Sequence, residues 1–205
     1  MGLLSASVSI VRYTVNGNIK APIMDSIAEG LHRHRIKEID NHPQDKIVGW
    51  TAYKNPYVAD FSGSSFSYDP YILFSMRIDK KSIPSKIVKK QFLAEVSRRL
   101  SDGSRQYISR NEKADIKNQI VESLNIKIPA TPNIHDIVWL PEASLLYFFS
   151  TLKSANEELE SLFLKSFDVS LIRLFPYTQA YFKAGLSESD LDKLSRLTPG
   201  HFATT

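Results

Sequence analysis

The sequence contains no cysteine among its 205 residues. This absence excludes disulfide bonds, thiolate nucleophiles and cysteine-ligated metals, and it fits a protein of the reducing cytoplasm. Apolar runs stay well short of a membrane span, and the first residues lack the basic and apolar regions of a signal peptide. The spacings G-x-x-x-x-G-K-[ST], G-x-G-x-x-G and G-x-S-x-G are also absent. We therefore expect a cytoplasmic protein with no membrane partner, no cofactor, no small-molecule substrate and no catalytic residues.

Apolar residues make up 42% of the sequence and charged residues 23%, which is ordinary for a globular protein of one large domain or two small ones. Period-two or continuous apolar patterns predict strands, and apolar residues repeated every three or four positions predict helices. The predicted strands cover 5–13, 46–53, 71–78, 134–140, 145–151 and 169–174. The predicted helices cover 22–35, 84–102, 109–124 and 154–167, with a short last helix near Ser187.

Strand pairs packed under helices predict an α+β fold, with an antiparallel or mixed sheet and helices on one face. The two central helices interrupt this pattern, so we expect them to project as a helical-hairpin arm. The predicted organisation is a discontinuous central domain (1–79 and 133–177), a basic arm (80–132) and a C-terminal tail (178–205). Segment 54–70 predicts a loop or a short irregular hairpin, and the prolines at 129 and 132 mark a loop.

Both arm helices carry apolar rows at helical spacing. The first row predicts a core face made of Val88, Phe92, Val96 and Leu100, with Leu93 beside them. The second row consists of Ile116, Ile120 and Leu124. Capping boxes are expected at two helix starts, Ser109 with Glu112 and Ser154 with Glu157.

Positive charge is concentrated in and around the predicted arm. Residues 77–117 hold twelve lysines and arginines against five acidic residues, a net charge of +7, while the rest of the chain holds 14 against 17, a net of −3. A local basic excess on an ordered element indicates a polyanion site, and mixed Lys and Arg without fixed spacing suits phosphates rather than base edges. A solvated helical hairpin without a ligand explains the same charges. The candidate DNA-binding residues are Arg77, Lys80, Lys81, Lys86, Lys89, Lys90, Arg98, Arg99, Arg105, Arg110, Lys113 and Lys117.

Three other groups of residues point less strongly to chemistry. The histidines His32, His34, His42 and His135 suggest a metal, but their spacing favours solvated or helix-capping roles, and we predict no metal site. Three aspartates could hold the Mg²⁺ of a nuclease, although turn positions explain Asp60, Asp69 and Asp79 better. Four aromatics could stack on single-stranded bases, but the edge of a core is the commoner role for Phe61, Phe66, Tyr68 and Tyr71.

Several motifs occur in an order that resembles the recombination-associated protein RdgC family. These are SVSIVRYTV near the start, Val48-Gly49-Trp50, Ile83-Pro84 before a long helix, the basic opening RNEKADIK at 110–117, Val138-Trp139 and SLIRLFP at 170–176. Each motif is short, and the resemblance rests on their order and spacing over residues 5–177.

The resemblance implies a nucleoid-associated protein that binds duplex DNA with little sequence preference and restrains RecA-driven recombination. It also implies a closed homodimeric ring whose positive inner surface surrounds the DNA. Lys80, Lys81, Lys86 and the Arg110–Lys113–Lys117 flank would then face the phosphates.

The sequence departs from the family pattern in two places. It stops soon after Pro176, where family members continue into one of the two dimer contacts, so we expect a short member, a truncated chain or an open dimer. After the second arm helix the family has Leu-Pro-Arg-Ala-Phe, whose phenylalanine helps to close the ring. Here Ala130 stands at that position, and Ile126 and Ile128 are the apolar candidates to replace the phenylalanine.

Three functions therefore compete. The first is a sequence-nonspecific binder of double-stranded DNA, with single-stranded DNA as an alternative ligand, that modulates recombination or replication. The second is an adaptor that uses the arm to bind an acidic protein surface, and the third is a metal-dependent nuclease.

Overall fold

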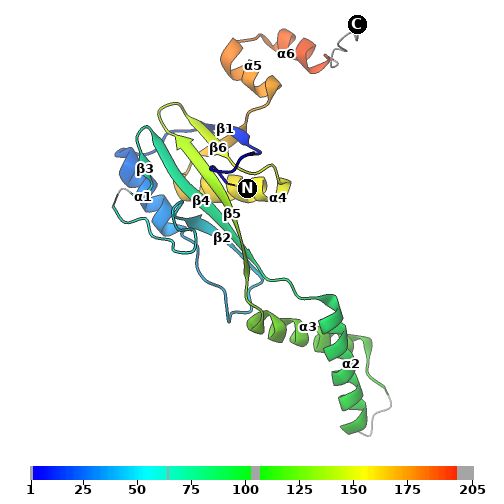
Figure 1. Cartoon of the computed structure of the whole chain (residues 1–205). Helices are drawn as coiled ribbons and strands as arrows, with labels where there is room; N and C mark the ends of the chain where they lie inside the picture. Colours follow the sequence, from blue (N-terminus) through cyan, green and yellow to red (C-terminus); the bar gives the residue numbers. More distant parts are fainter. Residues whose placement is uncertain (1, 64, 103–106, 198–205) are drawn as a thin grey trace.

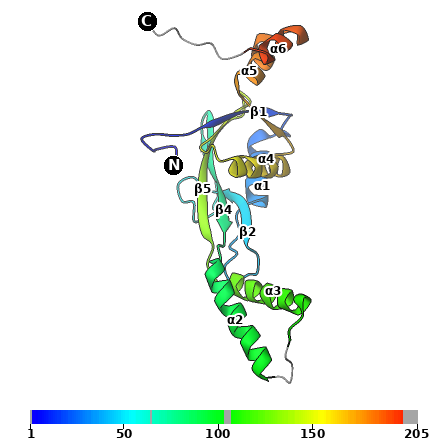
Figure 2. The ribbon, with the colours of Figure 1, turned by 90° about the vertical axis from the view of Figure 1, so that its right-hand side faces the viewer.

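The computed structural model describes residues 2–63, 65–102 and 107–197. A central sheet with two helices forms the body, a pair of helices projects from one end, and another pair stands at the opposite end (Figures 1 and 2). In chain order the elements are β1 Val11–Asn16, α1 Ile23–Arg33, β2 Lys46–Thr51, β3 Ser67–Tyr68, β4 Tyr71–Lys80, α2 Ser85–Asp102, α3 Arg110–Lys127, β5 Thr131–Leu140, β6 Leu145–Phe148, α4 Lys153–Phe167, β7 Ser170–Arg173, α5 Pro176–Ala184 and α6 Glu188–Ser195.

The strands form one antiparallel sheet in the order β2-β4-β5-β6-β1-β7, with β3 beside β4. The predicted α+β class is confirmed. The longest pairing joins β4 to β5, from Ile72 opposite Trp139 to Lys80 opposite Thr131. This β4–β5 ribbon runs past the end of β6, and β2 pairs along the other edge of β4 as far as Lys80. The ribbon leads into α2 on one strand and out of α3 on the other (Figure 1).

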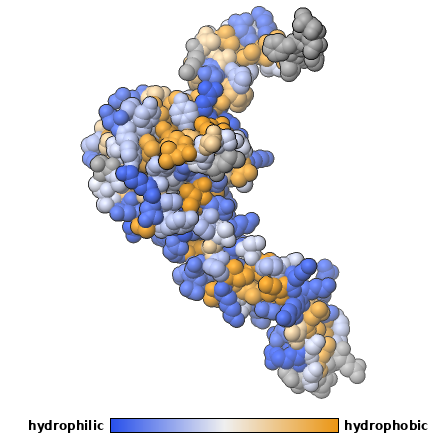
Figure 3. All heavy atoms as spheres, in the orientation of Figure 1, coloured by the Kyte–Doolittle hydropathy of each residue, from blue (hydrophilic) through white to orange (hydrophobic). Residues whose placement is uncertain are grey.

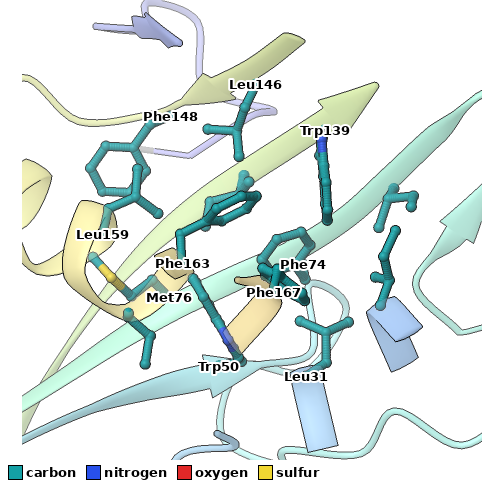
Figure 4. Close-up of a cluster of buried hydrophobic side chains, with 14 of the residues drawn as sticks. Leu31, Trp50, Phe74, Met76, Trp139, Leu146, Phe148, Leu159, Phe163 and Phe167 are labelled. Carbon is teal, nitrogen blue, oxygen red and sulfur yellow. The ribbon is translucent and has the colours of Figure 1, made fainter. Parts of the chain in front are cut away.

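Helices α1 and α4 cover one face of the sheet (Figure 2). Between them and the strands lies an aromatic core in which Trp50, Trp139 and Phe163 are fully buried (Figure 4). The Phe163 ring lies 4.9 Å from the Trp139 ring and 4.7 Å from the Phe167 ring, centroid to centroid. These packed rings fix α4 against the sheet, because large aromatic side chains dominate the burial energy of a core.

Three local predictions are wrong. The first strand begins at Val11 rather than at residue 5, because residues 5–10 are exposed and pair with no named strand. Pro132 lies within β5, at a level of the sheet where only β4 pairs with this strand, so its missing N–H costs no ladder bond on the other side. Helix α4 begins at Lys153, one residue before the predicted cap, and no side chain caps its N-terminus.

The C-terminal tail contains one helix that the sequence pattern did not predict. Pro176 follows the end of the preceding strand, as the sequence predicts, and it is also the first residue of α5, a position that suits proline because its missing N–H is not needed there. The predicted short helix near Ser187 is confirmed as α6. Ser187 caps this helix, because its hydroxyl oxygen accepts a hydrogen bond from the backbone N–H of Asp190.

Candidate nucleic-acid interface

The arm consists of α2 and α3, which cross each other beyond the end of the β4–β5 ribbon (Figures 1 and 2). The Ser109 cap of α3 is confirmed, since its Oγ accepts the Glu112 N–H at 3.2 Å. In α3, Ile116 and Leu124 of the predicted row are buried. The core face predicted for α2 is wrong. None of its described side chains is buried, because α2 packs mainly against the single helix α3, which leaves most of its surface exposed.

Arg77 is a correction to the predicted DNA-binding set. Its side chain is only 6% exposed and lies within the sheet. Its Nε donates to Asp79 Oδ1 at 2.7 Å, and its terminal nitrogen donates to Asp79 Oδ2 at 2.5 Å and to Glu38 at 2.9 Å. The hydrogen bond that Arg77 donates to Asp79 is the main cause that raises the pKa of Arg77, and the bond that it donates to Glu38 raises the pKa further. The guanidinium is committed to a buried ion pair and has no surface to offer a phosphate.

Lys81 is a second correction, because it is 4% exposed. Its Nζ donates to the carbonyl oxygens of His42 at 2.7 Å and Asn125 at 2.6 Å. Asn125 belongs to the last turn of α3, where a cation complements the helix dipole. A further bond joins the Ala130 N–H to Asp40 Oδ1 at 2.9 Å. Lys81 therefore fastens the arm to the loop that follows α1.

Seven of the predicted cations are exposed, and in the described part of the chain no acidic side chain pairs with any of them. We call this set the arm cations: Lys80, Lys86, Lys89, Lys90, Arg110, Lys113 and Lys117. Lys80 lies at the end of β4, and the others are spread over α2 and the first half of α3. The ribbon and the two helices thus carry an open basic surface away from the body.

Arg98 and Arg99 differ from the arm cations because both bind Glu95, at 2.8 Å and 2.9 Å. Hydrogen bonds from Arg98 first, and then from Arg99, lower the pKa of Glu95 to about 2. Arg99 also lies 3.7 Å from Glu112 of α3. Arg99 thus links the two arm helices. Arg105 lies outside the described residues.

An apolar groove of about 660 Å³ runs between α2 and α3. It is lined by Ile83, Ser85, Val88, Lys89, Phe92, Lys113, Ala114, Lys117 and Val121. The α2 side is the first half of the row predicted to face a core, and Figure 3 shows apolar surface gathered on the arm between hydrophilic residues. Sequence reasoning identified the row but not the groove, because the groove exists only where the two helices cross.

The sequence matches one family model, described as "RdgC: Putative exonuclease, RdgC", over residues 9–184. The chain belongs to the RdgC family. The resemblance predicted over residues 5–177 is thereby confirmed. No curated protein matches the sequence.

The family description names an exonuclease, so the three aspartates considered for metal binding matter here. Asp79 lies inside β4, is 1% exposed and holds Arg77, so the turn predicted at this residue is wrong. Asp60 accepts the Ser62 N–H at 2.9 Å, and Asp69 lies in the turn between β3 and β4. Within the described ranges no group of three His, Asp or Glu side chains is arranged to hold a metal ion.

Several of the histidines and aromatics singled out in the sequence pack against neighbouring rings in the body. His32 lies 5.9 Å from the Phe61 ring, His34 ends α1, and His135 lies 5.5 Å from the Phe148 ring. Phe61 and Phe66 are buried, so they belong to the core and offer no face to a base. Four exposed aromatics lie instead on and beside α5, where sequence reasoning expected no element: Phe175, Tyr177, Tyr181 and Phe182.

No described helix combines the length and the apolar character needed to cross a membrane.

Proposed function

We propose that this RdgC-family chain binds duplex DNA without sequence preference, through contacts between the arm cations and phosphates. The observation that carries the proposal is the set of seven exposed cations on one projecting element, none of them paired to an acid in the described part of the chain. Duplex DNA presents one negative charge per ~1.7 Å of its axis, and α2, with its 18 residues, spans about 27 Å. An element of this length can meet several phosphates at once.

The chemistry of the arm cations favours phosphates over bases. Six of them lie on the surfaces of α2 and α3, and five of these six are lysines. A lysine acts as a point charge on a flexible side chain, which suits a phosphate better than the two-point hydrogen bonding that reads a base edge. We further propose, from family membership, that the chain is a cytoplasmic, nucleoid-associated homodimer that modulates recombination by restraining RecA. Inhibition of RecA-catalysed strand exchange by the purified chain tests that biological role.

The direct test is a fluorescence-anisotropy titration against labelled duplexes of several random sequences over a salt series. Each phosphate contact contributes about 0.9 to the slope of log affinity against log salt, so seven contacts give a slope near −6. Three arm cations lie on α2 and α3 but do not line the groove between these helices. The triple variant Lys86→Gln, Lys90→Gln and Arg110→Gln should reduce the magnitude of the salt slope by about 2.7.

A matched control removes the same charge from the body, at the exposed residues Lys20, Lys37 and Lys165. We expect this control to bind as the parent does. The proposal is refuted if the parent chain does not bind at low salt, or if the body variant loses as much of the slope as the arm variant.

The same titration can test the exonuclease named in the family description. We propose binding without catalysis, because Asp60 and Asp79 are engaged in local hydrogen bonds and Asp69 lies in a turn. Progressive loss of an end label from the duplex in the presence of Mg²⁺ would contradict this part of the proposal.

A further inference from the structure

The groove between α2 and α3 is not explained by DNA binding. Phosphates gain nothing from an apolar lining, yet five of the nine residues along the groove are apolar: Ile83, Val88, Phe92, Ala114 and Val121. On α2 the lining residues recur at 85, 88, 89 and 92, the spacing of a helix face that normally lies against a partner. Exposed apolar surface of this kind, bordered by polar residues, marks an interaction site.

The geometry points to a docking site for an acidic amphipathic helix of a partner protein, seated between α2 and α3. The groove volume of about 660 Å³ is in the range of a formed binding site. A crossing pair of helices offers a concave surface that suits helix-in-groove recognition, in which apolar anchors one turn apart enter the groove.

The charge of the groove identifies the partner's chemistry. Its charged lining residues are Lys89, Lys113 and Lys117, and no acidic residue lines it. All three lysines are exposed, and in the described part of the chain none has an acidic partner. A helix with leucine or phenylalanine on one face and glutamate or aspartate on its flanks would fill the apolar lining and pair with these lysines. A basic or neutral helix would leave them unpaired.

The same three lysines belong to the arm cations, so the helix and duplex DNA would compete for them. The apolar lining distinguishes the two ligands, because only the helix uses it. Ala114 offers a clean perturbation, since it is small and exposed and lies in the wall of the groove. Ala114→Phe fills the groove without changing charge, and Ala94→Phe makes the same change at an exposed α2 position outside the lining.

The probe is a fluorescent peptide of about 15 residues with leucines at i, i+3, i+4 and i+7 and glutamates on the flanks. We expect it to bind the full chain and to be displaced by duplex DNA. Ala114→Phe should weaken peptide binding about tenfold or more, while Ala94→Phe binds like the parent. A peptide of identical composition with scrambled spacing, and one with lysine in place of glutamate, should bind at least about tenfold more weakly.

DNA binding by each variant is measured in parallel, and it should be the same for Ala114→Phe as for the parent. If the peptide does not bind at concentrations up to about 1 mM, or if Ala114→Phe binds it unchanged, the inference is overturned. It is also overturned if Ala114→Phe turns a dimer into a monomer while the peptide never binds, since a second copy of the chain would then occupy the groove. None of these results bears on the proposed DNA binding, which is tested separately by the titration of the parent chain and by the comparison of the arm variant with the body variant.

Discussion

Substitutions at the buried Arg77–Asp79 pair test whether Arg77 stabilises the fold or contributes to the proposed DNA binding. Asp79 is 1% exposed in its side chain and makes two hydrogen bonds to the guanidinium, whereas Glu38, the other partner, is 65% exposed. Asp79→Asn keeps the shape of the side chain but leaves the buried Arg77 guanidinium with only one carboxylate, that of the exposed Glu38. Removing one partner of a buried ion pair lowers the free energy of unfolding by about 3–5 kcal/mol. Glu38→Gln makes the same carboxyl-to-amide change in solvent and should cost at most about 1 kcal/mol.

Urea denaturation followed by circular dichroism measures both losses of unfolding free energy, with tryptophan fluorescence as a second probe of the transition. In the same variants, at urea-free conditions where they remain folded, the salt slope of DNA binding should equal that of the parent. The reasoning is refuted if the two substitutions cost the same, or if Asp79→Asn changes the slope by about one phosphate contact, since Arg77 would then act on DNA.

Three further predictions concern the body. Phe163→Ala should cost about 3–5 kcal/mol of unfolding free energy, because the ring is fully buried, whereas Leu164→Ala, at a residue 50% exposed, should cost far less in the same urea titration. Gly30→Ala should destabilise the chain by about 1–3 kcal/mol despite the better helix propensity of alanine, because the added Cβ would lie 2.6 Å from the Phe167 ring; a gain in thermal midpoint would contradict this packing. Burial lowers the pKa of His135 in the folded chain below its ordinary value of 6.5, so the folded state favours the neutral ring. The stability of the parent chain is therefore complete above about pH 6.5 and falls as the pH drops through the folded-state pKa. The variant His135→Gln should lose less urea resistance between about pH 7.5 and 5.5 than the parent does.

Most of the sheet was predictable because its residues obey local rules. The apolar run at Tyr71–Ile78 predicted a central strand, and β4 does pair on both sides. Pairing partners decided the cases where prediction failed. Residues 5–10 have an alternating pattern suitable for a strand but meet no named strand, and Pro132 is tolerated in β5 only because β6 does not extend that far. Neither fact is visible in a local window of sequence.

The candidate site shows the same limit in its charges. Composition could locate the basic segment, but it could not separate Arg77 and Lys81 from Lys80 and Lys86 only a few positions away. In β4 alternate residues share a face of the sheet, so Arg77 and Asp79 lie on the same side, and both are buried, whereas Lys80 at the end of the strand is exposed. Arg77 was placed beside Asp79 by this period of two, a signal that was present in the sequence and that a charge count ignores.

The two cations removed from the DNA-binding set explain how the others can act together. An arm that hung from flexible loops would lose entropy each time its cations were ordered on a phosphate backbone. Here the ribbon of β4 and β5 continues to Lys80 and Thr131, and the Lys81 ammonium joins its end both to the loop after α1 and to the C-terminal turn of α3. The base of the arm is therefore held before any ligand arrives. Lys81 holds the base of the arm and Arg77 is taken up by its ion pair, so neither counts among the phosphate contacts that we propose. The basic excess of the segment therefore overstates the number of contacts to expect, and the seven exposed arm cations carry the proposal.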